Sequence, residues 1–299
     1  MYIKTFLLFL ISILLFGCVS NTEEEKEHAK NVKIIDGKEY VLTNVEKFED
    51  YLLALDSNDI YSITKANKKF KELFDDKDSS QNDLAVLTIL DYFDKVSFYA
   101  NSFVFEDKVD YSPLVDIEFN NTSKNIPDQL ESTYEAINEN GFRVKETEGM
   151  FMLEVNPLFI QKEFYPYISK NLEIYLQQLG KENIEGFAQD AAIIIPYQTL
   201  VQRTIWWEDF ANSTKNSAIG VKAKEHYNYY FNNLCIGMDN TPAIESEQIA
   251  AYFQDGYNYL KEFAPNSSTY QRLKPYIEFL EQEKIQEAKD LVPGLITNE

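Results

Sequence analysis

Two adjacent acids beside two tryptophans are the residues of this chain that could most readily do acid–base chemistry. Trp206, Trp207, Glu208 and Asp209 are consecutive. An aromatic wall can raise the pKa of a carboxyl group and can bind a sugar ring, which would suit a hydrolase acting on glycan or peptide through carboxylates. Paired acids are also routine on solvated helix faces. Helical spacing places Trp207 with Leu200 on a buried stripe, so we expect both acids to face water.

Metal, cofactor and catalytic sites are not expected from the sequence. The chain has two histidines, His28 and His226, which are too few for a histidine-based zinc site. An acidic segment beginning at Asp76 has the look of a calcium loop, but Gln81 stands where the tight-turn glycine belongs and Leu87 where the bidentate glutamate belongs. The sequence has no G-x-S-x-G elbow and no glycine-rich phosphate loop. We therefore expect no metal, no cofactor and no catalytic residue.

The segment HYNYYFNN, from residue 226, has the most unusual local composition. Tyrosine and asparagine together are typical of adaptable binding surfaces, because they combine apolar area with hydrogen-bonding groups. Helical spacing predicts that three of the aromatic residues belong to the core: Tyr227, Tyr230 and Phe231. Tyr229 and Asn232 project elsewhere. With Trp206, Glu208 and Asp209, they form the candidate ligand surface.

A cysteine stands at the border between an apolar segment and an acidic one. Lys4 is followed by a run from Phe6 to Phe16 that is apolar except for one serine. This is the plan of a secretory signal, and the run is too short to span a membrane. The sequence from Leu15 to Cys18, LFGC, resembles the lipobox of bacterial lipoproteins. The resemblance implies diacylglyceryl attachment to Cys18, cleavage between Gly17 and Cys18, and acylation of the new amino terminus with a fatty acid such as palmitate.

Charge and cysteine content restrict the partners. The formal net charge is −21, from 49 acidic against 28 basic residues, and such a field repels the phosphates of nucleic acids. We expect no nucleic-acid partner and membrane attachment only through the lipid on Cys18. Cys235 is the only other cysteine, which excludes an internal disulfide in a lipidated chain, and its apolar helical face predicts a buried thiol.

Two short segments have the alternation of strands. Asp36-Gly37 separates two runs rich in valine, isoleucine and tyrosine, which predicts a hairpin. A second hairpin is predicted over residues 141–155, with its turn at Glu148-Gly149. Helical stripes fill most of the remaining sequence. Capping boxes are predicted at Thr43 and Glu46 and at Ser268 and Gln271. A helix is predicted to be interrupted at Pro166, another is predicted to end at Gly180, and a further helix is predicted from Pro196 through Trp207.

These patterns predict a mainly α protein: a multi-helix bundle or irregular helical array with two small β-hairpins. An α-solenoid of tetratricopeptide-like helix pairs is the alternative, although no fixed repeat period is found. We expect a lipoprotein signal peptide over residues 1–17, an acidic flexible tether over 18–31, and a single helix-rich extracytoplasmic body over 32–299. A transporter solute-binding protein would need two α/β lobes, and that alternation is missing.

Three short motifs stand in the second half of the chain: GFRVKETEGMFMLEVNPLF, TIWWEDFANSTKNS and NNLCIGMDNTPAIE. Together they resemble a pattern in uncharacterised secreted proteins and lipoproteins of Gram-positive bacteria, and this resemblance implies no activity. The leading hypothesis is a lipid-anchored, non-catalytic binding or scaffolding protein on the extracytoplasmic face of the cell membrane, with an unknown envelope protein, peptide or glycan as ligand. The alternative is an envelope hydrolase that acts through carboxylates.

Overall fold

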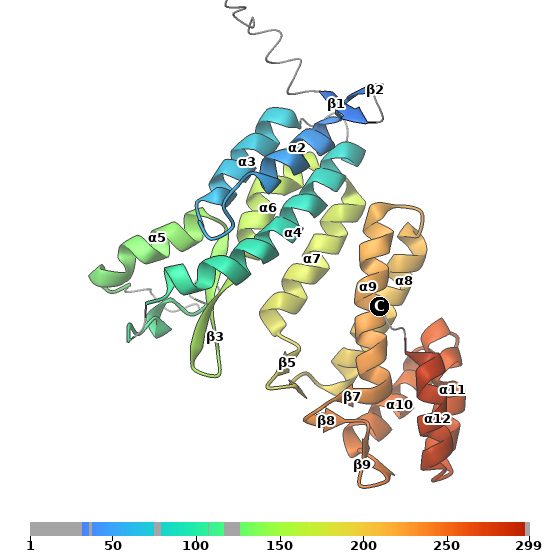
Figure 1. Cartoon of the computed structure of the whole chain (residues 1–299). Helices are drawn as coiled ribbons and strands as arrows, with labels where there is room; N and C mark the ends of the chain where they lie inside the picture. Colours follow the sequence, from blue (N-terminus) through green and yellow to red (C-terminus); the bar gives the residue numbers. More distant parts are fainter. Residues whose placement is uncertain (1–31, 36–37, 75–78, 107, 117–125, 297–299) are drawn as a thin grey trace, which may run out of the picture. The chain divides into compact units, whose positions relative to one another are not determined.

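The computed structural model describes residues 32–35, 38–74, 79–106, 108–116 and 126–296 of the chain (Figure 1). Residues 1–31, which hold the predicted signal, Cys18 and the tether, lie outside this part. The chain divides into two compact units, Met1–Lys47 and Phe48–Glu299. Among the described residues, no helix has both the length and the apolar character needed to cross a membrane.

The first unit contains an antiparallel hairpin and the start of a helix. Strand β1 (Val32–Ile35) pairs with β2 (Lys38–Val41), with Val32 opposite Val41, so the two predicted strands are confirmed. The turn residues Asp36 and Gly37 lie outside the described part. Helix α2 (Asn44–Leu53) begins directly after the predicted capping box. The Thr43 hydroxyl accepts from the Glu46 backbone N–H at 3.2 Å, and the Glu46 carboxylate accepts from the Thr43 backbone N–H at 2.7 Å.

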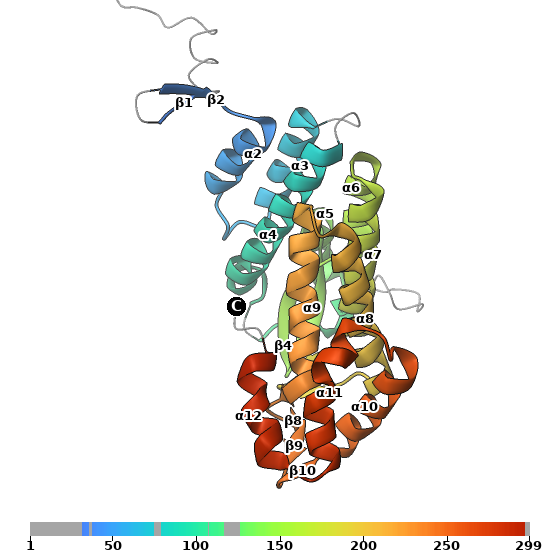
Figure 2. The ribbon, with the colours of Figure 1, turned by 90° about the vertical axis from the view of Figure 1, so that its right-hand side faces the viewer.

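The second unit is helical, with short hairpins between some of the helices (Figure 2). Its α-helices are α3 (Ser62–Leu73), α4 (Ser79–Val104), α5 (Glu131–Glu139), α6 (Pro157–Phe164), α7 (Lys170–Glu185), α8 (Tyr197–Thr214), α9 (Ala218–Ile236), α10 (Ala251–Phe263), α11 (Ser268–Glu281) and α12 (Ile285–Leu295). Three 3-10 turns are η1 (Ser112–Leu114), η2 (Asp128–Leu130) and η3 (Tyr165–Tyr167). Two-residue strands form three further hairpins: β5 (Ala188–Gln189) with β6 (Ala192–Ile193), β7 (Gly237–Met238) with β8 (Thr241–Pro242), and β9 (Ile244–Glu245) with β10 (Gln248–Ile249). The predicted mainly α class with small hairpins is confirmed.

The predicted second hairpin is confirmed in its register. Strand β3 (Phe142–Thr147) pairs antiparallel with β4 (Met150–Val155), and Val144 lies opposite Leu153. The two-residue turn between them has positive φ at Glu148 (54°) and Gly149 (76°). Such a turn matches the right-handed twist of the paired strands. The alternation of apolar residues on the two sides of this turn therefore predicts both the hairpin and its register.

Three helix ends differ from the sequence-based expectations. Helix α7 continues past Gly180 and ends before Gly186, whose φ is 74°. Gly180 instead marks a close approach, since a Cβ there would lie 3.0 Å from Cβ of Pro157. Helix α8 continues beyond Trp207 to Thr214, and the cap of α11 is the side chain of Ser267 rather than that of Ser268. The predicted interruption at Pro166 is confirmed, because η3 separates α6 from α7.

The core of the second unit is rich in aromatic residues. Helices α8 and α9 lie side by side as an antiparallel pair joined by a short loop (Figure 1). Their buried face includes Trp207, which is fully buried as predicted, and the three predicted core residues of α9: Tyr227, Tyr230 and Phe231. Cys235 is buried too, as predicted, and burial raises the pKa of its thiol to about 12. Tight aromatic packing of this kind fixes the positions of the helices that carry the site.

Candidate functional site

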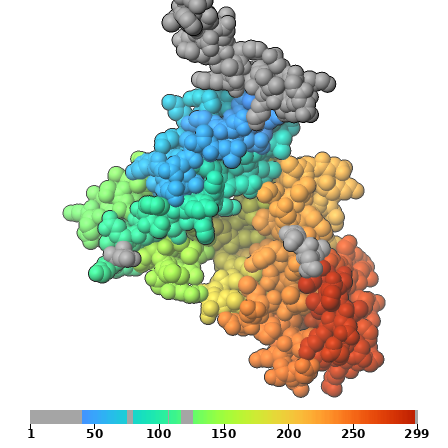
Figure 3. Space-filling view, in the orientation of Figure 1, coloured from blue at the N-terminus to red at the C-terminus, as the bar shows by residue number. Residues whose placement is uncertain are grey.

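A cavity of about 610 Å³ lies among α4, β4, α6, α7 and α9 of the second unit. Figure 3 shows α7 set back between α4 and α9, where the cavity opens. Each long helix contributes side chains spaced by three, four and seven residues, which share one face of a helix. These are Leu87, Leu90, Asp91 and Asp94 from α4, Leu176, Leu179, Gly180 and Asn183 from α7, and Lys222, Glu225, His226 and Tyr229 from α9.

One part of the cavity wall is aliphatic. It consists of Leu87, Leu90, Leu153, Val155, Pro157, Ile160, Leu176 and Leu179. Leu90 and Leu179 keep part of their surface exposed, whereas Leu87, Ile160 and Leu176 are buried. A half-buried aliphatic wall beside a few polar groups is the usual make-up of a small-molecule site.

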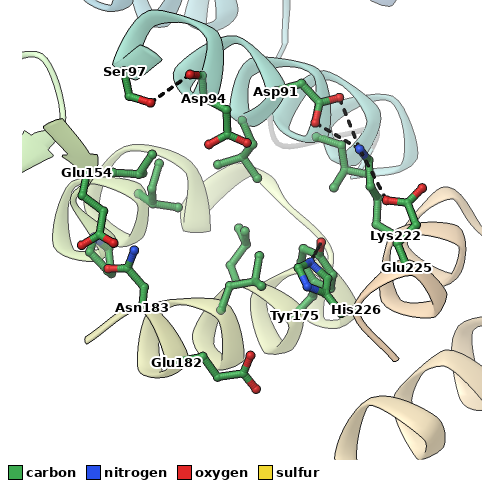
Figure 4. Close-up of a pocket in the computed structure, with 18 of the residues that line it drawn as sticks. Asp91, Asp94, Ser97, Glu154, Tyr175, Glu182, Asn183, Lys222, Glu225 and His226 are labelled. Atoms are coloured by element: carbon green, nitrogen blue, oxygen red, sulfur yellow. Dashed lines mark hydrogen bonds and ion pairs between the residues drawn. The ribbon is translucent and has the colours of Figure 1, made fainter. Parts of the chain in front are cut away.

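Another part of the cavity lining is acidic (Figure 4). Lys222 Nζ lies 3.1 Å from Oδ1 of Asp91 and 3.9 Å from Oε2 of Glu225, so one ammonium group serves two carboxylates from two helices. Asp94 lies one turn further along α4, and its carboxylate points towards the space between α4 and α7. Burial, followed by the neighbouring Asp91, raises the pKa of Asp94.

At the other end of the cavity, Arg143 holds Glu154 and Asn183. The Arg143 side chain is only 2% exposed, and it forms ion pairs with Asp116 and Glu154. It also donates to Oδ1 of Asn183 at 2.8 Å. Lys145 Nζ lies 3.0 Å from the second carboxylate oxygen of Glu154. Glu154 is therefore paired with two cations.

His226 lies between the cavity and the core. Its Nε2 is 3.0 Å from the Tyr175 hydroxyl, and its ring stacks on Trp207 with centroids 4.6 Å apart. Burial, aided by the nearby charge of Lys222, lowers the pKa of His226 to about 4. The imidazole is therefore neutral at physiological pH, with its ring nitrogen already paired to a tyrosine.

Glu182 is a buried acid behind the cavity wall, and its carboxylate points away from the cavity in Figure 4. It accepts from Trp207 Nε1 at 3.0 Å and from the Tyr230 hydroxyl at 2.9 Å. The same hydroxyl accepts from Arg203 at 3.1 Å. Burial raises the pKa of Glu182 in spite of these hydrogen bonds. The hydrogen bonds of Glu182 thus join α7 to Trp207 of α8 and to Tyr230 of α9.

The structure separates the residues of the predicted ligand surface. Tyr229 lines the cavity, is 47% exposed, and packs edge-on against Phe187 at 5.3 Å. Asn232, one turn further along α9, is half-buried and outside the cavity lining. Trp206 stacks on Phe210 with centroids 5.0 Å apart, also outside the cavity lining. Only Tyr229 of the five predicted residues therefore faces the cavity.

The expectation that Glu208 and Asp209 both face water is wrong for Glu208. Its side chain is buried, and its carboxylate accepts from the backbone N–H groups of Ser268 at 2.7 Å and Thr269 at 2.8 Å. Asp209 is exposed, and partial burial together with the charge of Glu208 raises its pKa. Because both oxygens of Glu208 are occupied by the start of α11, the two acids do not form a free catalytic pair.

Sequence reasoning missed the cavity acids Asp91, Asp94 and Glu225. The signal that could have found them is local: D-Y-F-D on α4 and K-x-x-E-H on α9 each place charged groups on a face otherwise expected to be apolar. Within the described part of the chain, no group of three or more His, Cys, Asp or Glu side chains is placed to hold a metal ion. Comparison of the chain with protein-family models, with curated proteins and with solved structures finds no match.

Proposed function

We propose that the protein is a lipid-anchored envelope protein that binds a ligand non-covalently in the cavity between α4, α7 and α9. The observation that supports this proposal is the cavity itself, whose aliphatic wall and convergent polar groups come from helices far apart in the sequence. Its histidine is neutral and paired with a tyrosine, and Glu208, one of the two predicted acids, is engaged in capping a helix. These contacts favour binding over hydrolysis.

The anchor is tested through Cys18, since thioether lipidation requires its sulfur. Cells that express the full chain and are fed a clickable fatty acid should label the wild type, whereas Cys18→Ser should remain unlabelled and migrate as an uncleaved precursor. Several acyl chains hold a protein stably on a membrane, because each buried methylene contributes about 0.8 kcal/mol. Equal labelling of wild type and variant would remove the anchor from the proposal and leave the cavity untouched.

The ligand site is tested by filling the cavity from α4. Leu90 lines the cavity, whereas Leu84 on the same helix is 42% exposed and lies outside the lining. We expect benzyl alcohol, a small neutral probe, to give a saturable ligand-observed NMR signal with the wild type and with Leu84→Trp. Leu90→Trp should abolish that signal, because the indole occupies the aliphatic wall. Identical titrations for the two variants would refute binding in this cavity.

A further inference from the structure

The cavity carries an excess of negative charge. The carboxylates in its lining are Asp91, Asp94, Glu154, Glu182 and Glu225, and the one ammonium group in the lining is Lys222. Two of these acids add little to the charge of the open space. Glu154 is balanced by Arg143 and Lys145, and the carboxylate of Glu182 points away towards Trp207.

The remaining excess is concentrated beside α4. Lys222 is shared between Asp91 and Glu225, which leaves that trio with a net negative charge. No ion pair within the described residues joins Asp94 to a cation. Burial and the proximity of Asp91 raise the pKa of Asp94, and the charge of Lys222 offsets this rise only in part.

The acidic group stands opposite an apolar wall. Asp94 reaches from α4 towards α7, where Leu176 and Leu179 line the same cavity (Figure 4). The exposed ring of Tyr229 borders the cavity on α9 and adds an aromatic surface, which is favourable for both apolar groups and cations. An occupant therefore meets the negative charge of Asp94 on α4 and the aliphatic surface of α7 within one cavity.

We infer that the ligand of this cavity is an organic cation: an ammonium group carried on an apolar body, with the ammonium against Asp94 and the body against the aliphatic wall. This inference rests on the proposed binding function and deepens it by giving the ligand class. An anion of the same shape is repelled by Asp94 and by the trio of Asp91, Lys222 and Glu225. A neutral analogue gains the apolar contact alone.

Three ring compounds that differ in charge test the inference on the full chain in phosphatidylcholine nanodiscs, with empty nanodiscs as the blank. They are benzylamine, benzyl alcohol and benzoate, each titrated by ligand-observed NMR. We expect benzylamine to bind about 10-fold more tightly than benzyl alcohol, with benzoate weakest, since one charge-assisted contact in a partly desolvated site has that effect. Asp94→Asn should lower benzylamine affinity about 3- to 10-fold and leave benzyl alcohol unchanged.

The matched control is Asp239→Asn, which removes the same charge from an exposed position outside the cavity lining and should change nothing. Equal affinities for the amine and the alcohol, both lost in Leu90→Trp, would overturn the cation preference and keep the cavity as a binding site. An amine preference that survives Asp94→Asn would overturn the assignment to Asp94. Absence of binding by all three probes would defeat the proposed function itself.

Discussion

The carboxylate of Glu208, in the middle of α8, accepts a hydrogen bond of 2.8 Å from the backbone N–H of Thr269, at the start of α11. A second bond of 2.7 Å comes from Ser268. The first N–H groups of a helix have no partner inside the helix, and a negative charge at that end is favourable. One acidic side chain therefore satisfies two backbone donors and fixes α11 against α8.

Replacement of Glu208 is expected to destabilise the fold. Glu208→Ala leaves the buried donor of Thr269 and the part-buried donor of Ser268 without their acceptor and should cost about 2–4 kcal/mol, whereas Glu208→Gln keeps one acceptor oxygen and should cost about 1 kcal/mol. The neighbouring Asp209→Ala, at an exposed position, should change stability by less than about 0.5 kcal/mol. Urea unfolding of the three variants measures this order, and equal losses at 208 and 209 would contradict the capping role.

Two glycines with the same backbone angle should respond differently to alanine. Gly141 and Gly149 both have φ of 76°, so a side chain is strained at either position. A Cβ at Gly141 would also lie 2.6 Å from Cδ1 of Phe159, whereas nothing lies within 4 Å at Gly149. Gly149→Ala should cost about 1 kcal/mol, and Gly141→Ala about 2 kcal/mol more, because the ring must move. Thermal unfolding checks the difference, and similar melting temperatures would show that Phe159 yields freely.

Histidine titration should report the burial of His226. We expect the imidazole signal of His226 to titrate near a pKa of about 4, below the ordinary value of a histidine. Because the folded pKa is depressed below the unfolded one, the neutral ring contributes its full stability above pH about 6.5. That contribution, about 3 kcal/mol, is lost as the pH falls towards 4. His226→Gln should show a smaller loss across this range.

Glu182 should give the opposite pH dependence. Burial raises its folded pKa above the unfolded value of 4.5, so the folded state binds the proton more tightly. Its contribution to stability is fully present below the unfolded pKa and declines as the pH rises through the folded pKa. The stability of Glu182→Gln relative to wild type should therefore increase above pH about 4.5. Glu173→Gln, on the same helix but outside this network, serves as the control. A constant difference across the range would show that folding does not raise the pKa of Glu182.

Local pattern predicted the secondary structure well, because the signals that specify it are local. The alternation around Glu148-Gly149 gave the β3–β4 register, and the Thr43 and Glu46 pair gave the start of α2. Gly180 was misread as a stop because its reason lies in another element, the close approach of Pro157. Glycine spacing alone does not distinguish a helix end from a close contact.

The site was mostly beyond the sequence because its partners are distant. Asp91 and Lys222, which meet beside the cavity, are 131 residues apart. Glu208 was assigned to a solvated face because nothing local indicates that the start of α11, 60 residues later, covers it. Tyr229 could be predicted because helical spacing assigns the neighbouring aromatic residues Tyr227, Tyr230 and Phe231 to the core. Tyr229 does not fall on that buried stripe.

The link between Asp91 and Lys222 spans the acidic side of the cavity, yet it is an exposed pair, with side chains 63% and 34% accessible. Such pairs contribute about 0–1 kcal/mol and are screened at physiological ionic strength. Buried packing holds the surrounding walls, so a rearrangement of this edge costs less free energy than one of the walls. An exposed side chain such as that of Lys222 can change rotamer without backbone movement. For the proposed ligand we therefore expect a residence time set by its own contacts with the cavity, and we expect added salt to shorten it.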